Sequence, residues 1–79
     1  MHFVKEVAYK SEYKLIITFE NGTSKLVDLF PHFDGEFFKP LKDMEYFKTV
    51  KVNAYIDTIV WPNDADYSPD FLSEVGETI

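Results

Sequence analysis

Three aspartates near the C-terminus, Asp64, Asp66 and Asp70, are the side chains whose type and spacing come closest to a chemical site. Carboxylates at alternate positions bind Ca²⁺ in the EF-hand loop, which also requires Gly at position 6 and Glu at position 12. In a loop that starts at Asp64, those two positions hold Pro69 and Val75. The sequence therefore predicts no metal ion here. A small enzyme or metal-dependent ligand-binding domain built on the three aspartates is the alternative interpretation.

The same stretch fits the corner between a strand and a helix. Pro62 has no N–H and would end a strand ladder, while Asn63 and Asp64 favour a turn. Ser68 is a good helix N-cap, and Asp70 suits the positive first turn of a helix. We expect turn and capping chemistry to explain these residues.

No other pattern in the chain indicates catalysis. The two histidines are isolated: His2 is terminal and His32 stands among aromatic residues. The chain has no cysteine, no glycine-rich phosphate loop, no G-x-S-x-G elbow and no H-E-x-x-H pair. We expect a protein that is not an enzyme and that uses no cofactor.

Length and composition predict one small folded domain. The chain has 79 residues, of which 46% are hydrophobic and 18% aromatic, and aromatic rings bury a large area each. We expect a single domain over residues 1–79, with residues 75–79 frayed. The N-terminus does not resemble a signal peptide, and no apolar run approaches a membrane span. Together with the absence of cysteine, this predicts a cytoplasmic protein with no membrane contact.

The elements expected around the corner are short. Alternation and turn signals predict strands over 3–10, 13–20, 24–29, 50–52 and 58–61, with helices starting after Asp43 and after Ser68. This is an α+β fold: a small, mainly antiparallel sheet of about five strands with two short helices.

The Asn21-Gly22 pair between two apolar runs predicts a hairpin with a two-residue type I′ turn. That turn would place Ile17 opposite Leu26 and Ile16 opposite Val27.

Charge is unevenly distributed along the chain. Residues 1–51 hold eight lysines and eight acidic residues, whereas residues 52–79 hold six acidic residues and no basic one. There is no arginine, the usual bidentate reader of guanine and phosphate. Direct nucleic-acid binding is therefore disfavoured, and we expect a small basic protein as the partner.

Surplus aromatic residues accompany this acidic segment. Tyr and Trp often anchor protein interfaces, although a small domain can also use large rings to build its core, and the sequence leaves both interpretations open. The candidate interaction residues are Trp61, Asp64, Asp66, Tyr67, Asp70, Phe71 and Glu74.

The order and spacing of several motifs resemble a known family. The chain contains L-x-I-x-F-x-N-G with V-D-L (residues 15–29), P-L-K-D-x-x-x-F (residues 40–47) and T-I-V-W-P-N-D-A-D-Y-S-P-D-F-L (residues 58–72). It is similar to the two-four-four-two family of domains of unknown function, which is small, bacterial and α+β. The resemblance implies a non-catalytic protein-interaction module, an antitoxin-like partner of a small toxin, because genes of members often adjoin a candidate toxin gene.

Two residues depart from the pattern of that family. Asp57 and Asp64 stand where its members usually have Gly. Asp tolerates the left-handed region better than most residues, so we expect both turns to form at some cost in energy.

Overall fold

The computed structural model describes residues 3–79 and contains a four-stranded antiparallel sheet. Its strands are β1 (Val4–Ser11), β2 (Lys14–Phe19), β3 (Ser24–Asp28) and β6 (Glu77–Thr78), in the order β1-β2-β3-β6. The first three are joined by tight hairpins, which suits their alternating sequences.

A second, two-stranded sheet pairs β4 (Lys51–Asn53) with β5 (Thr58–Val60). The predicted α+β fold is confirmed, but the strands form two sheets instead of one sheet of about five. β4 runs past the edge strand β1, whose ladder has register shifts between Val4 and Glu6 and between Tyr9 and Ser11. Such bulges bend an edge strand and interrupt pairing.

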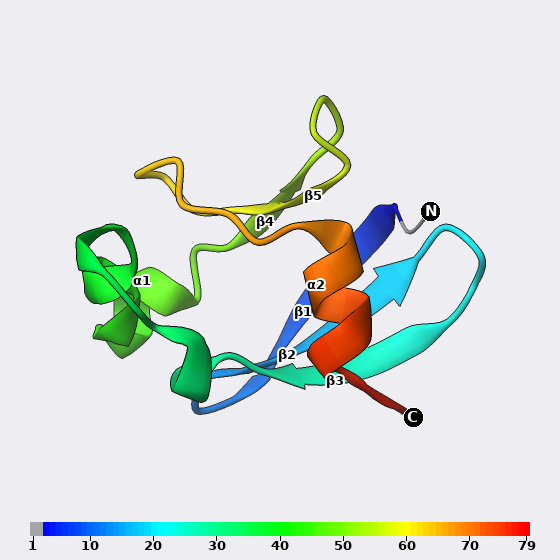
Figure 1. Cartoon of the computed structure of the whole chain (residues 1–79), viewed down its shortest axis with the longest axis horizontal. Helices are drawn as coiled ribbons and strands as arrows, with labels where there is room; N and C mark the ends of the chain where they lie inside the picture. The colour runs from blue at the N-terminus through cyan, green and yellow to red at the C-terminus, as the bar shows by residue number, and fades with distance from the viewer. Residues whose placement is uncertain (1–2) are drawn as a thin grey trace.

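Both predicted helices form with the predicted caps. The Asp43 side chain accepts the Glu45 N–H at the start of α1 (Met44–Phe47). The Ser68 side chain accepts the Phe71 N–H at the start of α2 (Pro69–Val75). Two 3₁₀ helices, η1 (Phe30–His32) and η2 (Glu36–Lys42), fill the proline-containing segment between β3 and α1. Figure 1 shows α2 lying across the four-stranded sheet, with the β4–β5 hairpin projecting beyond it.

The predicted register of the second hairpin is wrong by one residue. Ile16 lies opposite Leu26, and Ile17 lies opposite Lys25. The Gly22 N–H donates to the Phe19 carbonyl, and of the loop residues 20–22 only Gly22 has a positive φ (87°). This is a three-residue loop that ends in a left-handed glycine, not a type I′ turn.

The observed register decides which side chains are buried. Leu15, Ile17 and Phe19 of β2 share the inner face with Val27, and all four are almost completely buried. Leu26 turns to the other face. Because residues 26 and 27 are both apolar, the hydrophobic pattern is compatible with either register.

Lys25 also lies on the inner face, at its margin. Its Nζ donates to the Ser73 carbonyl (2.6 Å) and to the Ser73 hydroxyl (3.2 Å), near the C-terminal end of α2. A cation at this end of a helix stabilises the unpaired carbonyls. The lysine therefore joins α2 to the sheet.

In place of the frayed end expected for residues 75–79, the chain forms β6 along β3. Gly76 allows this close approach, because a Cβ there would lie 2.9 Å from the Leu72 carbonyl oxygen and 2.9 Å from the Lys25 Cβ. The chain can therefore leave α2 directly onto the edge of β3.

Candidate interaction surface

The stretch from Trp61 to Ala65 forms a tight loop that reverses the chain after β5. The Asp64 N–H donates to the Trp61 carbonyl (2.9 Å), and the Trp61 N–H donates to the Ala65 carbonyl (3.0 Å). Asn63 Oδ1 accepts the Ala65 N–H, and Asp64 has a φ of 68°. The predicted corner is confirmed, and it has the same hydrogen-bond pattern as the loop that ends at Gly22.

Asp57 and Asp64 both adopt the left-handed conformation. Asp57 has a φ of 56° at the end of the β4–β5 turn, and its carbonyl accepts the Val4 N–H (2.9 Å). The expectation that both turns form with Asp in place of Gly is confirmed.

Trp61 lies in the core with only 1% of its surface exposed. Its indole Nε1 donates to the Phe47 carbonyl (2.9 Å), and its ring packs against the rings of Phe47 and Tyr67. The predicted role as a surface anchor requires an exposed ring, so Trp61 does not have it in this fold.

Tyr67 is also buried, with 8% of its surface exposed. Its hydroxyl donates to the His32 carbonyl (2.9 Å). Burial raises the pKa of the Tyr67 phenol well above its usual value of 10, and the negative charge of Asp34 adds to this rise. Tyr67 is therefore a neutral hydrogen-bond donor of the core and not an exposed anchor.

Phe71, the third predicted anchor, is only half-buried. Its ring stacks on Tyr67 (5.4 Å, 14°), and Phe38 stacks on Tyr67 at 4.8 Å. The His32 ring meets Phe71 edge-on at 5.0 Å. Half-buried Phe38 and His32 thus join the aromatic surface, although they come from a segment without periodicity that offered no signal in the sequence.

The predicted acidic residues are all exposed but do not converge. Asp70 and Glu74 are four residues apart on α2 and therefore neighbours on its surface. Asp66 pairs with Val60 through an isolated β-bridge, and Asp64 belongs to a loop that projects away from α2 in Figure 1. Within residues 3–79, no group of three or more His, Cys, Asp or Glu side chains is arranged to hold a metal ion. His2 lies outside the described residues.

We define the α2 surface as the exposed or half-buried residues gathered around this helix: His32, Phe38, Asp70, Phe71 and Glu74. It combines half-buried rings with carboxylates, and Asp34 lies close enough for its charge to act on Tyr67 at the centre of the stack. Such a surface can bind a partner that offers apolar and cationic groups.

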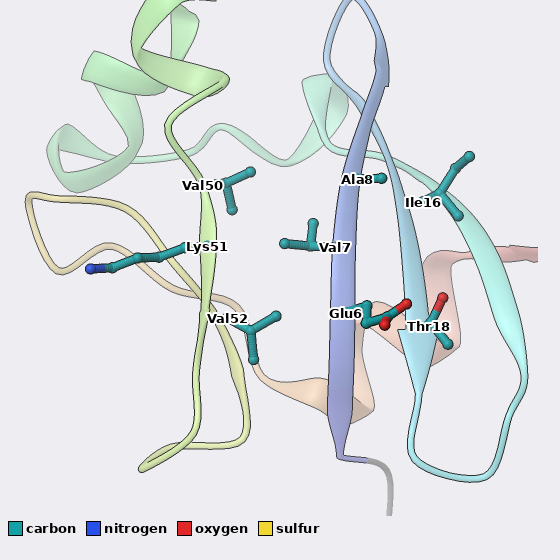
Figure 2. Close-up of a pocket in the computed structure, with 8 residues that line it drawn as sticks. All are labelled: Glu6, Val7, Ala8, Ile16, Thr18, Val50, Lys51 and Val52. Atoms are coloured by element: carbon teal, nitrogen blue, oxygen red, sulfur yellow. The ribbon is translucent and has the colours of Figure 1, made fainter.

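A groove of about 410 Å³ lies on another side of the molecule, between β4 and the sheet. Figure 2 shows Val50 and Val52 pointing toward β1, Val7 pointing toward β4, and Lys51 pointing away. The other polar side chains of the groove are Glu6 and Thr18. This arrangement does not bring an acid and a base together, so the groove fits an apolar contact better than a reaction.

We predict that Asp64→Gly stabilises the protein. Glycine avoids the cost of a left-handed conformation, about 1–2 kcal/mol, but loses more backbone entropy on folding, about 0.5–1 kcal/mol. The free energy of unfolding, measured by urea denaturation, should rise by about 0.5–1 kcal/mol. Asp66 in the same segment does not have a positive φ, so the control substitution Asp66→Gly relieves no strain and should lower the free energy of unfolding. A loss of stability in Asp64→Gly would show that the Asp64 carboxylate stabilises the corner.

The raised pKa of Tyr67 predicts a specific loss of stability in alkali. Below pH 10 the phenol is neutral in both states; above it, the unfolded chain releases the proton while the folded protein keeps it. The free energy of unfolding should therefore fall from pH 10 upward, with a contribution of at most about 1.4 kcal/mol per pH unit from this group. Tyr67→Phe should reduce that slope, and Tyr55→Phe, at a 97% exposed position, should not. Equal slopes in the parent and Tyr67→Phe would contradict the assignment.

Comparison with known proteins shows the family to which the chain belongs. Neither the curated proteins nor the solved structures give a match to the chain. A family model described as "Protein of unknown function (DUF2442)" matches residues 4–75, from the first residue of β1 to the last of α2. Because this match covers most of the chain, the protein belongs to the DUF2442 family.

Proposed function

We propose that this domain is a non-catalytic protein-interaction module whose α2 surface binds a small basic protein. The observation that carries the proposal is the placement of exposed Asp70 and Glu74 beside the half-buried ring of Phe71, in a segment, residues 52–79, that contains no basic residue. Exposed carboxylates attract a basic partner over a distance, and a partly desolvated ring slows its release.

The resemblance to the family suggests the identity of that partner. Because genes of members often adjoin a candidate toxin gene, the proposed role is that of an antitoxin-like protein bound to the product of its neighbouring gene. The absence of cysteine agrees with a cytoplasmic setting for this pair. Among residues 3–79, none of the helices has the length and hydrophobicity that a membrane span requires.

The proposal predicts that charge and ring variants change different rate constants for binding the neighbouring gene product. Asp70→Asn combined with Glu74→Gln should lower the association rate and flatten its salt dependence. Phe71→Ala should raise the dissociation rate about 30-fold if the ring is a hot spot worth about 2 kcal/mol. The measurement is surface plasmon resonance at two salt concentrations, after circular dichroism has shown that each variant is folded.

A matched control removes the same charge elsewhere. Glu12→Gln combined with Glu45→Gln neutralises two exposed carboxylates outside the α2 surface and should leave the association rate close to that of the parent. If the neighbouring gene product does not bind, or if both charge pairs act alike, the α2 surface is not the binding site. Mixed-sequence duplex DNA serves as a second ligand, for which we expect no binding at physiological salt.

A further inference from the structure

Two loops of the chain have the same backbone hydrogen bonds, and each contains an asparagine directly before a residue with a positive φ. The first loop, residues 19–23, joins β2 to β3, and the second, residues 61–65, follows β5. In each loop the N–H of the first residue donates to the carbonyl of the last, at 2.8 Å and 3.0 Å. The N–H of the residue with positive φ, Gly22 or Asp64, donates to the carbonyl of the first residue, at 2.9 Å in both.

The two asparagine side chains also make the same contact. Asn21 Oδ1 accepts the Thr23 N–H (3.0 Å), and Asn63 Oδ1 accepts the Ala65 N–H (3.1 Å), which is the usual bond from Asn to the backbone two residues on. Asn21 is exposed, whereas Asn63 is half-buried. The loops therefore hold both asparagines in the same way but differ in exposure and in the residue that follows.

The residue after an asparagine decides how readily the side chain reacts with the backbone. Asparagine is thermolabile, because the nitrogen of the next peptide group can attack its amide carbon and close a cyclic succinimide. Gly22 has no side chain to hinder that nitrogen and allows more backbone conformations than other residues. Asp64 carries a side chain beside the nitrogen, and its carboxylate opposes the loss of the amide proton that the attack requires.

The first loop also lies where local opening costs little. Glu20, Asn21 and Gly22 are all exposed, and a Cβ added to Gly22 would have no heavy atom within 4 Å. Figure 1 shows this loop at the end of the sheet away from α1. Exposed loop tips open locally at a small fraction of the global free energy of unfolding. The hydrogen bond from the Gly22 N–H can therefore break for long enough to free the nitrogen.

We propose that Asn21 is a site of spontaneous deamidation, in which the Gly22 backbone nitrogen displaces ammonia from the side-chain amide. A base in solution removes the Gly22 amide proton, and the bond from this nitrogen to Asn21 Cγ forms. The bond from Cγ to Nδ2 breaks, and Nδ2 takes up a proton and leaves as ammonia. Water then opens the succinimide at either carbonyl and gives aspartate or isoaspartate, with no oxidation or reduction.

Both products change the hairpin between β2 and β3. Aspartate and isoaspartate each add a negative charge beside Glu20. Isoaspartate also adds a methylene group to the main chain within the loop, so the hydrogen bonds that close residues 19–23 cannot all keep their geometry. The modification lies outside the α2 surface and does not depend on the function proposed for it.

The test is timed incubation of the full chain in mildly alkaline buffer at physiological temperature, followed by peptide mapping with liquid chromatography and mass spectrometry. Asn21 should be converted to a mixture of aspartate and isoaspartate at least about tenfold faster than Asn63, which corresponds to a barrier lower by about 1.4 kcal/mol. Isoaspartate is the signature of the cyclic route, because direct hydrolysis of the amide gives aspartate alone.

The matched control exchanges the residues that follow the two asparagines. Gly22→Asp gives the first loop the Asn-Asp pair with which the second loop already forms at a φ of 68°, and it should slow conversion of Asn21 about tenfold or more. Asp64→Gly should accelerate conversion of Asn63 by a similar factor without exchanging Asn63 itself. Circular dichroism should first show that both variants are folded.

Three results would overturn the proposal. The first is equal conversion of Asn21 and Asn63 in the parent. The second is a product at Asn21 that contains aspartate but no isoaspartate. The third is an Asp64→Gly variant in which Asn63 reacts no faster than in the parent, because exposure and not the glycine would then explain the difference between the two asparagines.

Discussion

The hydrogen bond from the Trp61 indole to the Phe47 carbonyl joins the end of α1 to the segment that follows β5, and so fixes the relative position of these two parts of the domain. Phe47 is the last residue of α1, and Trp61 directly follows β5. The bond is buried, so the indole N–H would lose its only compensation for desolvation if the two segments separated. The rings of Phe47 and Tyr67 both pack against the indole, and Tyr67 in turn stacks on Phe71 of α2. The loop after β5 therefore begins at a residue whose ring is buried in the core.

The residues of the corner fall into two groups: those that hold the chain in place and those whose side chains face solvent. Backbone hydrogen bonds, the left-handed Asp64 and the buried rings hold the chain in place. The carboxylates of Asp66, Asp70 and Glu74 point to solvent. The acidic character of the corner is therefore available to a partner, and the aromatic stack reaches the surface only through its half-buried members.

Much of the fold could be predicted from the sequence because its signals are local. Caps at Asp43 and Ser68, strand alternation and the proline after Trp61 each act within a few residues. The register of the second hairpin could not be predicted, since apolar residues at 26 and 27 fit either side of the sheet. The split into two sheets depends on how β1 bends beside β4, which is a contact between distant segments.

The candidate site was predicted in part for the same reason. The exposure of the acidic residues could be predicted because charged side chains stay in contact with water. Phe71 was named as a candidate because it is an aromatic residue within the acidic segment. For Trp61 and Tyr67 the sequence left an interface role and a core role open, and the structure places both in the core, where a chain of 79 residues needs its largest rings. Phe38 and His32 reach the aromatic stack only through tertiary packing.

Rings and turns stabilise the corner, and its carboxylates do not hold the fold together. The most direct test is urea denaturation of the variant that combines Asp64→Asn, Asp66→Asn, Asp70→Asn and Glu74→Gln. Each change is at an exposed position, so the free energy of unfolding should stay within about 1 kcal/mol of the parent. A loss of about 3 kcal/mol or more would show instead that the carboxylates hold the fold together.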